Sequence, residues 1–470
     1  MTNFSNRARW AAVSMVIAFA AAACVDWKKE LLEPQNPGLI DPTATGSPSA
    51  AIALKVGAMG RLRRVVHGCD GNSECLWQES GMVADEFKNS DFQPDRQDID
   101  QRNLKSTNGI LDFRALTGIR GPIRDAIAAM RLFVPQNTWD IGELYMGLAF
   151  IEMSLAENYC NGVPLGSTTA GVVTLGPGLT NQQLYDSALT HVDSALGFIG
   201  SATDVASVAV RNASSIVKAR ILVDKGGQFG AAAALVPASA IPSTYQYVFT
   251  TSTALNSDDN GLWTLNNSVA RISVADSFDI IAGQQNVIKN ALPFISANDP
   301  RVPTLSGQAA TPKVNAEDGI TPLWIQRLFP GRDDPMPMVS GIDARLIEAE
   351  ARLNATDYAG MVVILNQLRT DRPTIGNFRP SVMPANLTVP ASKTAAEDLF
   401  FREKAFWTFG RGQRMSDLRR LIRQYGRTQD KVFPTGAYVK GGVYGTDVNF
   451  AVPDAELINP NFKGCIDRNA

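Results

Sequence analysis

The sequence predicts an all-α, mainly helical protein: a tetratricopeptide-like α/α superhelix interrupted by long irregular insertions. Three observations support this fold class. Apolar residues recur at helical spacing in several segments, two helix starts carry capping signals, and residues 345–372 form two helical patterns joined by a short polar turn. A single helical hairpin cannot bury its apolar face alone, so several must stack against one another.

The first hairpins are predicted within residues 143–235. One helix shows apolar residues on a helical repeat at Leu144, Leu148, Ile151 and Leu155. The next helix begins at Thr180, because Thr180 and Gln183 have the spacing of a capping box, in which hydroxyl and amide satisfy exposed backbone donors. A further helix is expected over 215–223, and its partner over 229–235.

A second group of hairpins is predicted within residues 342–425, where the pair at 345–372 lies. Its first helix has an apolar face formed by Leu346, Ala349 and Leu353. Thr394 and Glu397 repeat the capping-box spacing and predict another helix that runs to about Phe409. Between the two groups, residues 236–341 are rich in Ser, Thr, Asn, Pro and Gly, with scattered aromatics. Such insertions on a helical scaffold usually carry the binding surface.

The start of the chain predicts a secretory signal peptide over residues 1–23. Arg7 and Arg9 precede an uncharged apolar run, residues 10–23, which is too short to span a bilayer as a helix. Three alanines stand directly before Cys24, and this pattern resembles a bacterial lipobox, in which the cysteine is lipidated and becomes the mature N-terminus. The alternative is an ordinary signal peptide that is cut at the same place.

Lipid on Cys24 would hold the protein at a membrane without a spanning helix. Residues 24–47 are polar and rich in Pro, Gly, Asn and Thr, which is typical of a flexible tether. Residues 48–470 are then the folded helical domain.

The other cysteines predict disulfides. An even number of cysteines in an exported protein favours pairing, and four allow three connectivities. Cys69 and Cys75 flank a short loop, so a local bridge is the simplest arrangement, and Cys160 would then pair with Cys465. The short spacing does not match a zinc knuckle.

Composition argues against several functions. The formal net charge is −2, which leaves no basic surface for nucleic acid. The only histidines, His67 and His191, lie far apart in sequence, so histidine-based catalysis and zinc sites are disfavoured. We predict no catalytic residue, cofactor or metal. A glycosidase is the enzymatic alternative, with carboxylates drawn from Asp85, Glu86, Asp95, Asp98 and Asp100.

Several short motifs, in order along the chain, resemble those of one family. They are Ala84-Asp85-Glu86, the segment from Glu157 to Leu165, Asp299-Pro300-Arg301, Arg345 to Ala351, Leu365 to Arg369, Arg402-Glu403-Lys404, Gly412-Gln413-Arg414, Asp417 to Arg420, Val452-Pro453 and Glu456 to Asn461. Together they resemble the SusD/RagB nutrient-uptake lipoproteins. The chain departs from the family pattern at Met415, at Trp407-Thr408 and at Cys160. From the residues themselves, we expect Arg402, Glu403, Arg414 and Asp417 to cap and bridge packed helices.

This resemblance implies a non-enzymatic lipoprotein exposed on the bacterial outer membrane. Such proteins bind an oligosaccharide, or in some cases a peptide, and deliver it to a TonB-dependent (SusC-like) transporter. Sugar rings stack on aromatic side chains, so Phe92, Trp263 and Trp324 are the candidate ligand-binding residues, with core packing as the alternative for each. The alternative function is a lipid-anchored tetratricopeptide scaffold that assembles other envelope proteins.

Overall fold

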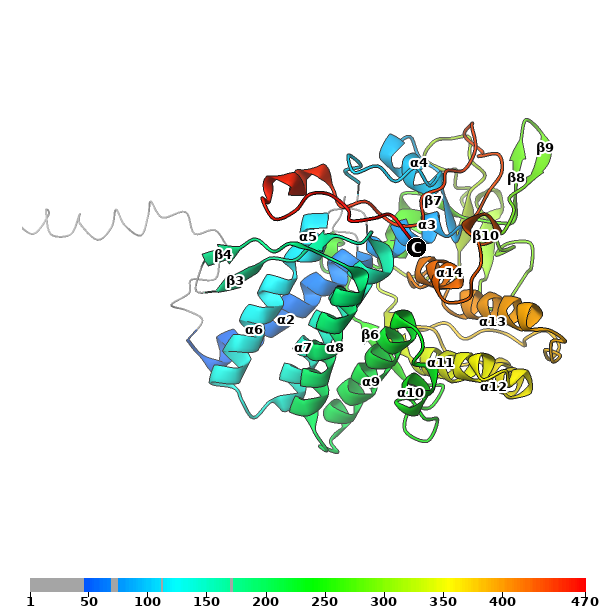
Figure 1. Ribbon diagram of the computed structural model, residues 1–470. Helices are drawn as coiled ribbons and strands as arrows, with labels where there is room; N and C mark the ends of the chain where they lie inside the picture. The colour runs from blue at the N-terminus through cyan, green and yellow to red at the C-terminus, as the bar shows by residue number, and fades with distance from the viewer. Residues whose placement is uncertain (1–45, 69–74, 111–112, 170–171) are drawn as a thin grey trace, which may run out of the picture. The chain divides into compact units, whose positions relative to one another are not determined.

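The computed structural model describes residues 46–68, 75–110, 113–169 and 172–470. Residues Ala51–Ala470 form one compact unit, shown in Figure 1, and only residues 46–50 are described of the unit before it. Cys24 and Cys69 lie outside the described residues, so the lipid anchor and the bridge between Cys69 and Cys75 stay predictions. No helix in the described part of the chain is long and apolar enough to cross a membrane.

Helices dominate the structure. They are α2 (Pro48–Arg63), α3 (Leu76–Val83), α4 (Pro94–Asp100), α5 (Phe113–Gly118), α6 (Arg120–Phe133), α7 (Thr138–Asn158), α8 (Asn181–Ile199), α9 (Val205–Lys225), α10 (Phe229–Ala234), α11 (Gly341–Asn354), α12 (Tyr358–Asp371), α13 (Lys393–Trp407) and α14 (Arg414–Arg423). The mainly helical fold class is therefore confirmed.

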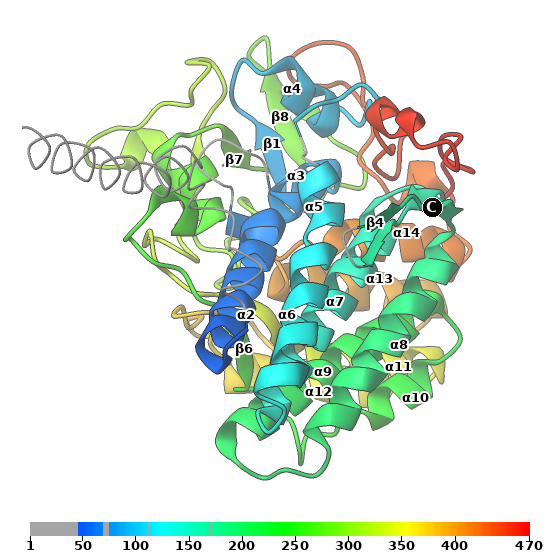
Figure 2. The ribbon, with the colours of Figure 1, turned by 90° about the vertical axis from the view of Figure 1, so that its left-hand side faces the viewer.

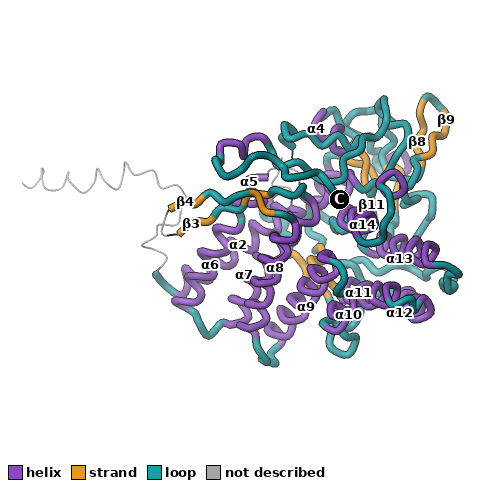
Figure 3. Tube along the Cα trace, in the orientation of Figure 1, coloured by secondary structure: helices purple, strands orange, loops and turns teal. Residues whose placement is uncertain are grey.

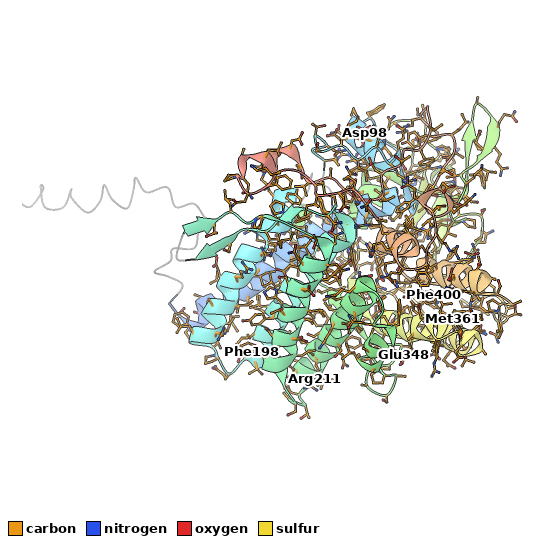
Figure 4. The ribbon with its side chains drawn as sticks, in the orientation of Figure 1. Asp98, Phe198, Arg211, Glu348, Met361 and Phe400 are labelled. Atoms are coloured by element: carbon orange, nitrogen blue, oxygen red, sulfur yellow. A yellow bond between two sulfur atoms is a disulfide. The ribbon has the colours of Figure 1, made fainter. Side chains whose placement is uncertain are left out.

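Successive helices pack side by side, as stacked hairpins require. Helix α7 contacts α6, α8 and α9, and these four helices lie next to one another in both Figure 1 and Figure 2. Contacts continue from α9 through α10 to α11, which packs on α12 and α13. The core between them is apolar, and it includes Met361 of α12 and Phe400 of α13, both labelled in Figure 4.

The helix starts show which capping predictions hold. At α8 the Thr180 hydroxyl accepts from the backbone N–H of Gln183 at 3.2 Å, and the Gln183 side chain accepts from the N–H of Thr180 at 2.8 Å. The capping box is thus confirmed. The cap predicted at Thr394 is wrong, because Ser392 has the extended backbone of an N-cap and its hydroxyl accepts from the N–H of Ala395. Helix α13 therefore begins at Lys393 and ends at Trp407.

The pair predicted at 345–372 is confirmed as α11 and α12. Its first helix buries Leu346, Ala349 and Leu353, the apolar face that the sequence indicates. Asp357 caps the second helix by accepting from the backbone N–H of Gly360 at 2.8 Å.

The strands are short, and each pairs antiparallel with one other strand. The pairs are β1 (Phe87–Asn89) with β7 (Ile272–Val274), β2 (Val163–Pro164) with β5 (Gly178–Leu179), β3 (Ser167–Thr169) with β4 (Val172–Thr174), β6 (Gln246–Phe249) with β12 (Met336–Ser340), β8 (Phe278–Ile281) with β9 (Gln284–Val287) and β10 (Thr304–Ser306) with β11 (Trp324–Gln326).

Two long-range connections position the loops. The register of β1 and β7 places Phe87 opposite Val274, so the loop after β1 lies beside the irregular segment between α10 and α11. A disulfide between Cys160 and Cys465 fastens the C-terminal tail to the end of α7. Figure 3 shows that loops prevail around α4 and β8, whereas α6 to α9 are regular helix. The candidate site lies in this loop-rich region.

Candidate ligand-binding site

A surface pocket of about 320 Å³ opens where the loop after β1 meets the segment around β7. Its lining combines one aromatic ring, one aliphatic side chain and five polar or charged groups. These residues are Asp91, Phe92, Gln93, Arg96, Ile110, Arg271 and Glu317. The volume lies at the lower end of the range for small-molecule sites, so the pocket suits a compact ligand.

Phe92 stands on the rim of the pocket with 74% of its surface exposed. The loop that carries it is held by two short turns. The N–H of Asp91 donates to the Asn89 side chain at 3.0 Å, and the N–H of Gln93 donates to the Asp91 carboxylate at 2.9 Å. On the other side, Ser90 donates its N–H to the carbonyl of Arg271 at 2.9 Å. The ring is therefore presented to solvent by an ordered loop.

Two ion pairs line the pocket. Arg96 and Asp91 form the inner pair and are almost fully buried. Arg271 and Glu317 form the outer pair, 2.9 Å apart, and both side chains are about one-third exposed. Burial, together with the nearby Arg271 guanidinium, lowers the pKa of Arg96 to about 10, so this side chain is still a cation at neutral pH.

Lys440 ties the pocket's segments together from behind. Its ammonium group donates to the carbonyl of Asp91 at 2.7 Å and pairs with the Asp318 carboxylate at 2.8 Å. The N–H of Asp318 in turn donates to the carbonyl of Ser90 at 3.1 Å. The strand-end loop, the turn that carries Glu317 and the C-terminal loop are thus joined by one polar network.

A group of buried carboxylates supports the same loop. Asp100, at the end of α4, accepts from the N–H of Asn89 and from the hydroxyl of Tyr438, both at 2.8 Å. Burial raises the pKa of Asp100 to about 7, despite these two hydrogen bonds. Burial and the proximity of Asp100 also raise the pKa values of Glu79 and Asp85 well above their usual range.

Three of the five carboxylates considered for a glycosidase are buried. Asp85, Glu86 and Asp100 are at most 1% exposed, so a substrate cannot reach them. Asp98, labelled on α4 in Figure 4, forms an ion pair with Lys105 at 2.8 Å. In the described part of the chain, no group of three His, Cys, Asp or Glu side chains is placed to hold a metal ion. The lining of the pocket instead offers an apolar ring and a set of hydrogen-bonding groups.

The structure places the three aromatic candidates differently. Phe92 lines the pocket, whereas Trp263 and Trp324 do not. Trp263 begins a π-helical turn, and its backbone N–H donates to the Asn260 side-chain oxygen at 3.0 Å. Trp324 begins β11, is partly buried and packs against the main core. A ligand contact by either tryptophan stays a prediction.

Comparison with solved structures places the fold. No family model matches the sequence, and no curated protein matches it. The structure is, however, similar to a SusD superfamily protein from Bacteroides vulgatus, with a TM-score of 0.59, 14% identity, and coverage of 90% of this chain and 99% of that one. The chain has the SusD-like fold.

Two further SusD-like structures match over similar lengths. A laminarin-binding SusD-like protein is 14% identical, with a TM-score of 0.57 and coverage of 89% of this chain and 99% of that one. NanU of Bacteroides fragilis is 13% identical, with a TM-score of 0.58 and coverage of 92% and 100%. The SusD-like fold is therefore preserved across nearly the whole chain at very low sequence identity.

Several of the motifs that resemble the SusD/RagB family lie in the core of this SusD-like fold, and no residue of these motifs lines the pocket. Arg301, in the Asp299-Pro300-Arg301 turn, pairs with Asp299 at 2.6 Å and with Glu403 of α13 at 2.8 Å. Glu403 also pairs with Arg369 of α12 at 2.7 Å. Burial alone would raise the pKa of Glu403, but the two arginines lower it. These ion pairs join the insertion to two helices.

Sequence reasoning proposed Phe92 as a ligand-binding residue but did not propose the charged residues that line the same pocket. Asp91 lies two residues after β1 and Arg96 lies in α4, and an aromatic residue flanked by an acid in a polar loop was the available signal. Arg271 and Glu317 lie in an irregular segment without periodicity. Their approach to Phe92 depends on the pairing of β1 with β7, which nothing in the local sequence encodes.

Proposed function

We propose that this protein binds an oligosaccharide at the Phe92 pocket and delivers it to a TonB-dependent transporter of the outer membrane. The observation that carries the proposal is an exposed aromatic ring beside paired charged side chains. A sugar ring has apolar C–H faces and a rim of hydroxyls, so it uses both kinds of surface. The laminarin-binding protein with the same fold supports this ligand class.

In this proposal, lipid on Cys24 anchors the protein at the cell surface, and residues 24–47 leave the folded domain free to meet the transporter. More than one acyl chain on the anchor gives stable attachment to the membrane without a spanning helix. The function requires capture and release of the ligand and no chemical step.

The pocket is tested by Phe92→Ala. We expect a loss of at least about tenfold in glycan affinity, or about 1.4 kcal/mol, because the stacking surface disappears. Since Phe92 is largely exposed, thermal stability should not change. Leu132→Ala is the matched control, because Leu132 is 71% exposed at the end of α6 and does not line the pocket. Equal affinities of both variants would contradict a ligand site at Phe92.

The partner is tested by purification of the protein from detergent-solubilised native membranes, followed by mass spectrometry. We expect a large β-barrel transporter in stoichiometric amount. Recovery of envelope assembly factors without such a barrel would contradict delivery to a transporter and would favour the scaffold alternative.

A further inference from the structure

The charges of the pocket are already balanced before a ligand arrives. Each of the two arginines that line it has a carboxylate partner within the pocket, Arg96 with Asp91 and Arg271 with Glu317. The nearby ammonium of Lys440 is paired with Asp318. A ligand therefore meets a lining in which every cation is matched by an anion.

This balance disfavours an acidic ligand. A carboxylate or sulfate that entered the pocket would lose part of its hydration and would lie close to Glu317 and Asp91, both of which repel it. Glu317 takes the Nε–H of the Arg271 guanidinium, and an acid that paired with the other N–H groups of Arg271 would lie beside the Glu317 carboxylate. The gain from Arg271 is therefore offset by repulsion from Glu317.

An uncharged sugar avoids this penalty. A hydroxyl group both donates and accepts, so a single hydroxyl can donate to the Glu317 carboxylate while it accepts from the Arg271 guanidinium. The two groups are 2.9 Å apart and about one-third exposed, so both remain within reach of a ligand. Hydrogen bonds to charged partners are stronger than neutral ones, and they need no net charge on the sugar.

We propose that the pocket selects uncharged sugars over sugars that carry carboxylate or sulfate groups, and that Glu317 sets this preference. The inference rests on the proposed function, because it concerns the ligand of the same site. The pocket volume of about 320 Å³ lies at the lower end of the range for small-molecule sites, so the preference applies to a short stretch or an end of the oligosaccharide.

The experiment uses a matched pair of ligands. An array of neutral and acidic glycans first identifies the neutral oligosaccharide that the mature protein binds best. Oxidation of the primary hydroxyls of this oligosaccharide to carboxylates then gives an acidic form with the same linkages. Calorimetry measures the affinity of the wild type for both forms.

The wild type should bind the neutral form at least about tenfold more tightly than the oxidised form. Glu317→Gln keeps an acceptor in the pocket but removes the charge that repels the oxidised form, so the oxidised form should bind more tightly and the preference should fall to about threefold or less. Glu348→Gln is the control for net charge, because Glu348 pairs with Arg345 on α11 and is labelled far from α4 in Figure 4. It should keep the wild-type preference.

The possible failures are distinguishable. If no glycan on the array binds, or if Phe92→Ala binds as the wild type does, both the proposed function and this inference are overturned. If the oxidised form binds as tightly as the neutral one and Phe92→Ala still abolishes binding, only the charge preference is overturned. If Glu317→Gln and Glu348→Gln behave alike, Glu317 does not set the preference.

Discussion

Asp100 provides a test of how the pocket loop is supported. Its carboxylate is fully buried and holds the backbone of Asn89 and the hydroxyl of Tyr438, while other acids surround it. Asp100→Asn keeps a side-chain oxygen that can accept both hydrogen bonds but removes the charge. Unlike most substitutions of a buried, hydrogen-bonded residue, this one should stabilise the protein above neutral pH.

The magnitude follows from the pKa of Asp100. Burial raises this pKa from 3.8 to about 7 in the folded protein. Between these two pH values the unfolded chain has released a proton that the folded protein still holds, so the free energy of unfolding falls as the pH rises. Each pKa unit corresponds to about 1.4 kcal/mol, which gives a loss of at most about 4 kcal/mol across the window. The loss is complete above the folded pKa and absent below the unfolded one.

Denaturant unfolding of the wild type and of Asp100→Asn at about pH 4 and about pH 8 measures this effect. The two proteins should have similar stability at the lower pH, and the variant should be the more stable at the higher pH, by up to about 4 kcal/mol. Asp98→Asn, on the same helix, is the control, since Asp98 belongs to an exposed ion pair with Lys105 and should shift stability by less than about 1 kcal/mol. A variant that is destabilised equally at both pH values would refute the reasoning.

Two further predictions concern the core. Glu403→Gln removes the charge that pairs with both Arg301 and Arg369, and it leaves Arg301 with Asp299 alone and Arg369 without its Glu403 partner. Calorimetric unfolding should therefore show a loss of about 3–5 kcal/mol, whereas Glu348→Gln should lose less than about 1 kcal/mol. Joint replacement of Cys160 and Cys465 by serine removes a bridge between residues 305 positions apart and should lower the free energy of unfolding by about 2–5 kcal/mol. As the control, a mild reductant that leaves this bridge intact should not change the stability of the wild type. Stability unchanged by either substitution would contradict the role assigned to that contact.

The fold could be predicted where local chemistry decides the structure. The apolar face of α11 is a regular pattern, because every third or fourth residue of a helix faces the core. The capping box at Thr180 depends only on residues within one turn of the helix start. The cap at Thr394 failed for an instructive reason. Ser392, two residues earlier, also has a hydroxyl that can cap a helix. The extended backbone at Ser392 makes this residue, and not Thr394, the N-cap of α13.

The pocket could be predicted only in part. The sequence suggested Phe92 as a ligand-binding residue but left open whether its ring faces solvent or packs in the core. Arg271 reaches it through the pairing of β1 with β7, and Glu317 through the network around Asp318 and Lys440. Contacts between residues so far apart in sequence depend on the assembled fold, which a single sequence does not reveal without related sequences or a structure.

The residues that reveal the fold and the residues that form the pocket are different sets. This separation explains how the chain shares a fold with proteins to which its sequence is hardly similar. Arg301, Glu403 and Arg369 are buried ion-pair partners that hold the scaffold together. The scaffold requires these contacts whatever ligand the protein binds. Phe92 and Glu317 are exposed residues of loops, where substitution leaves the core unaffected. A fold can therefore persist at 14% identity while its pocket changes, so a structural neighbour supports a class of ligand but does not identify the ligand of this chain. The ligand has to be inferred from the charges and the ring of this pocket itself.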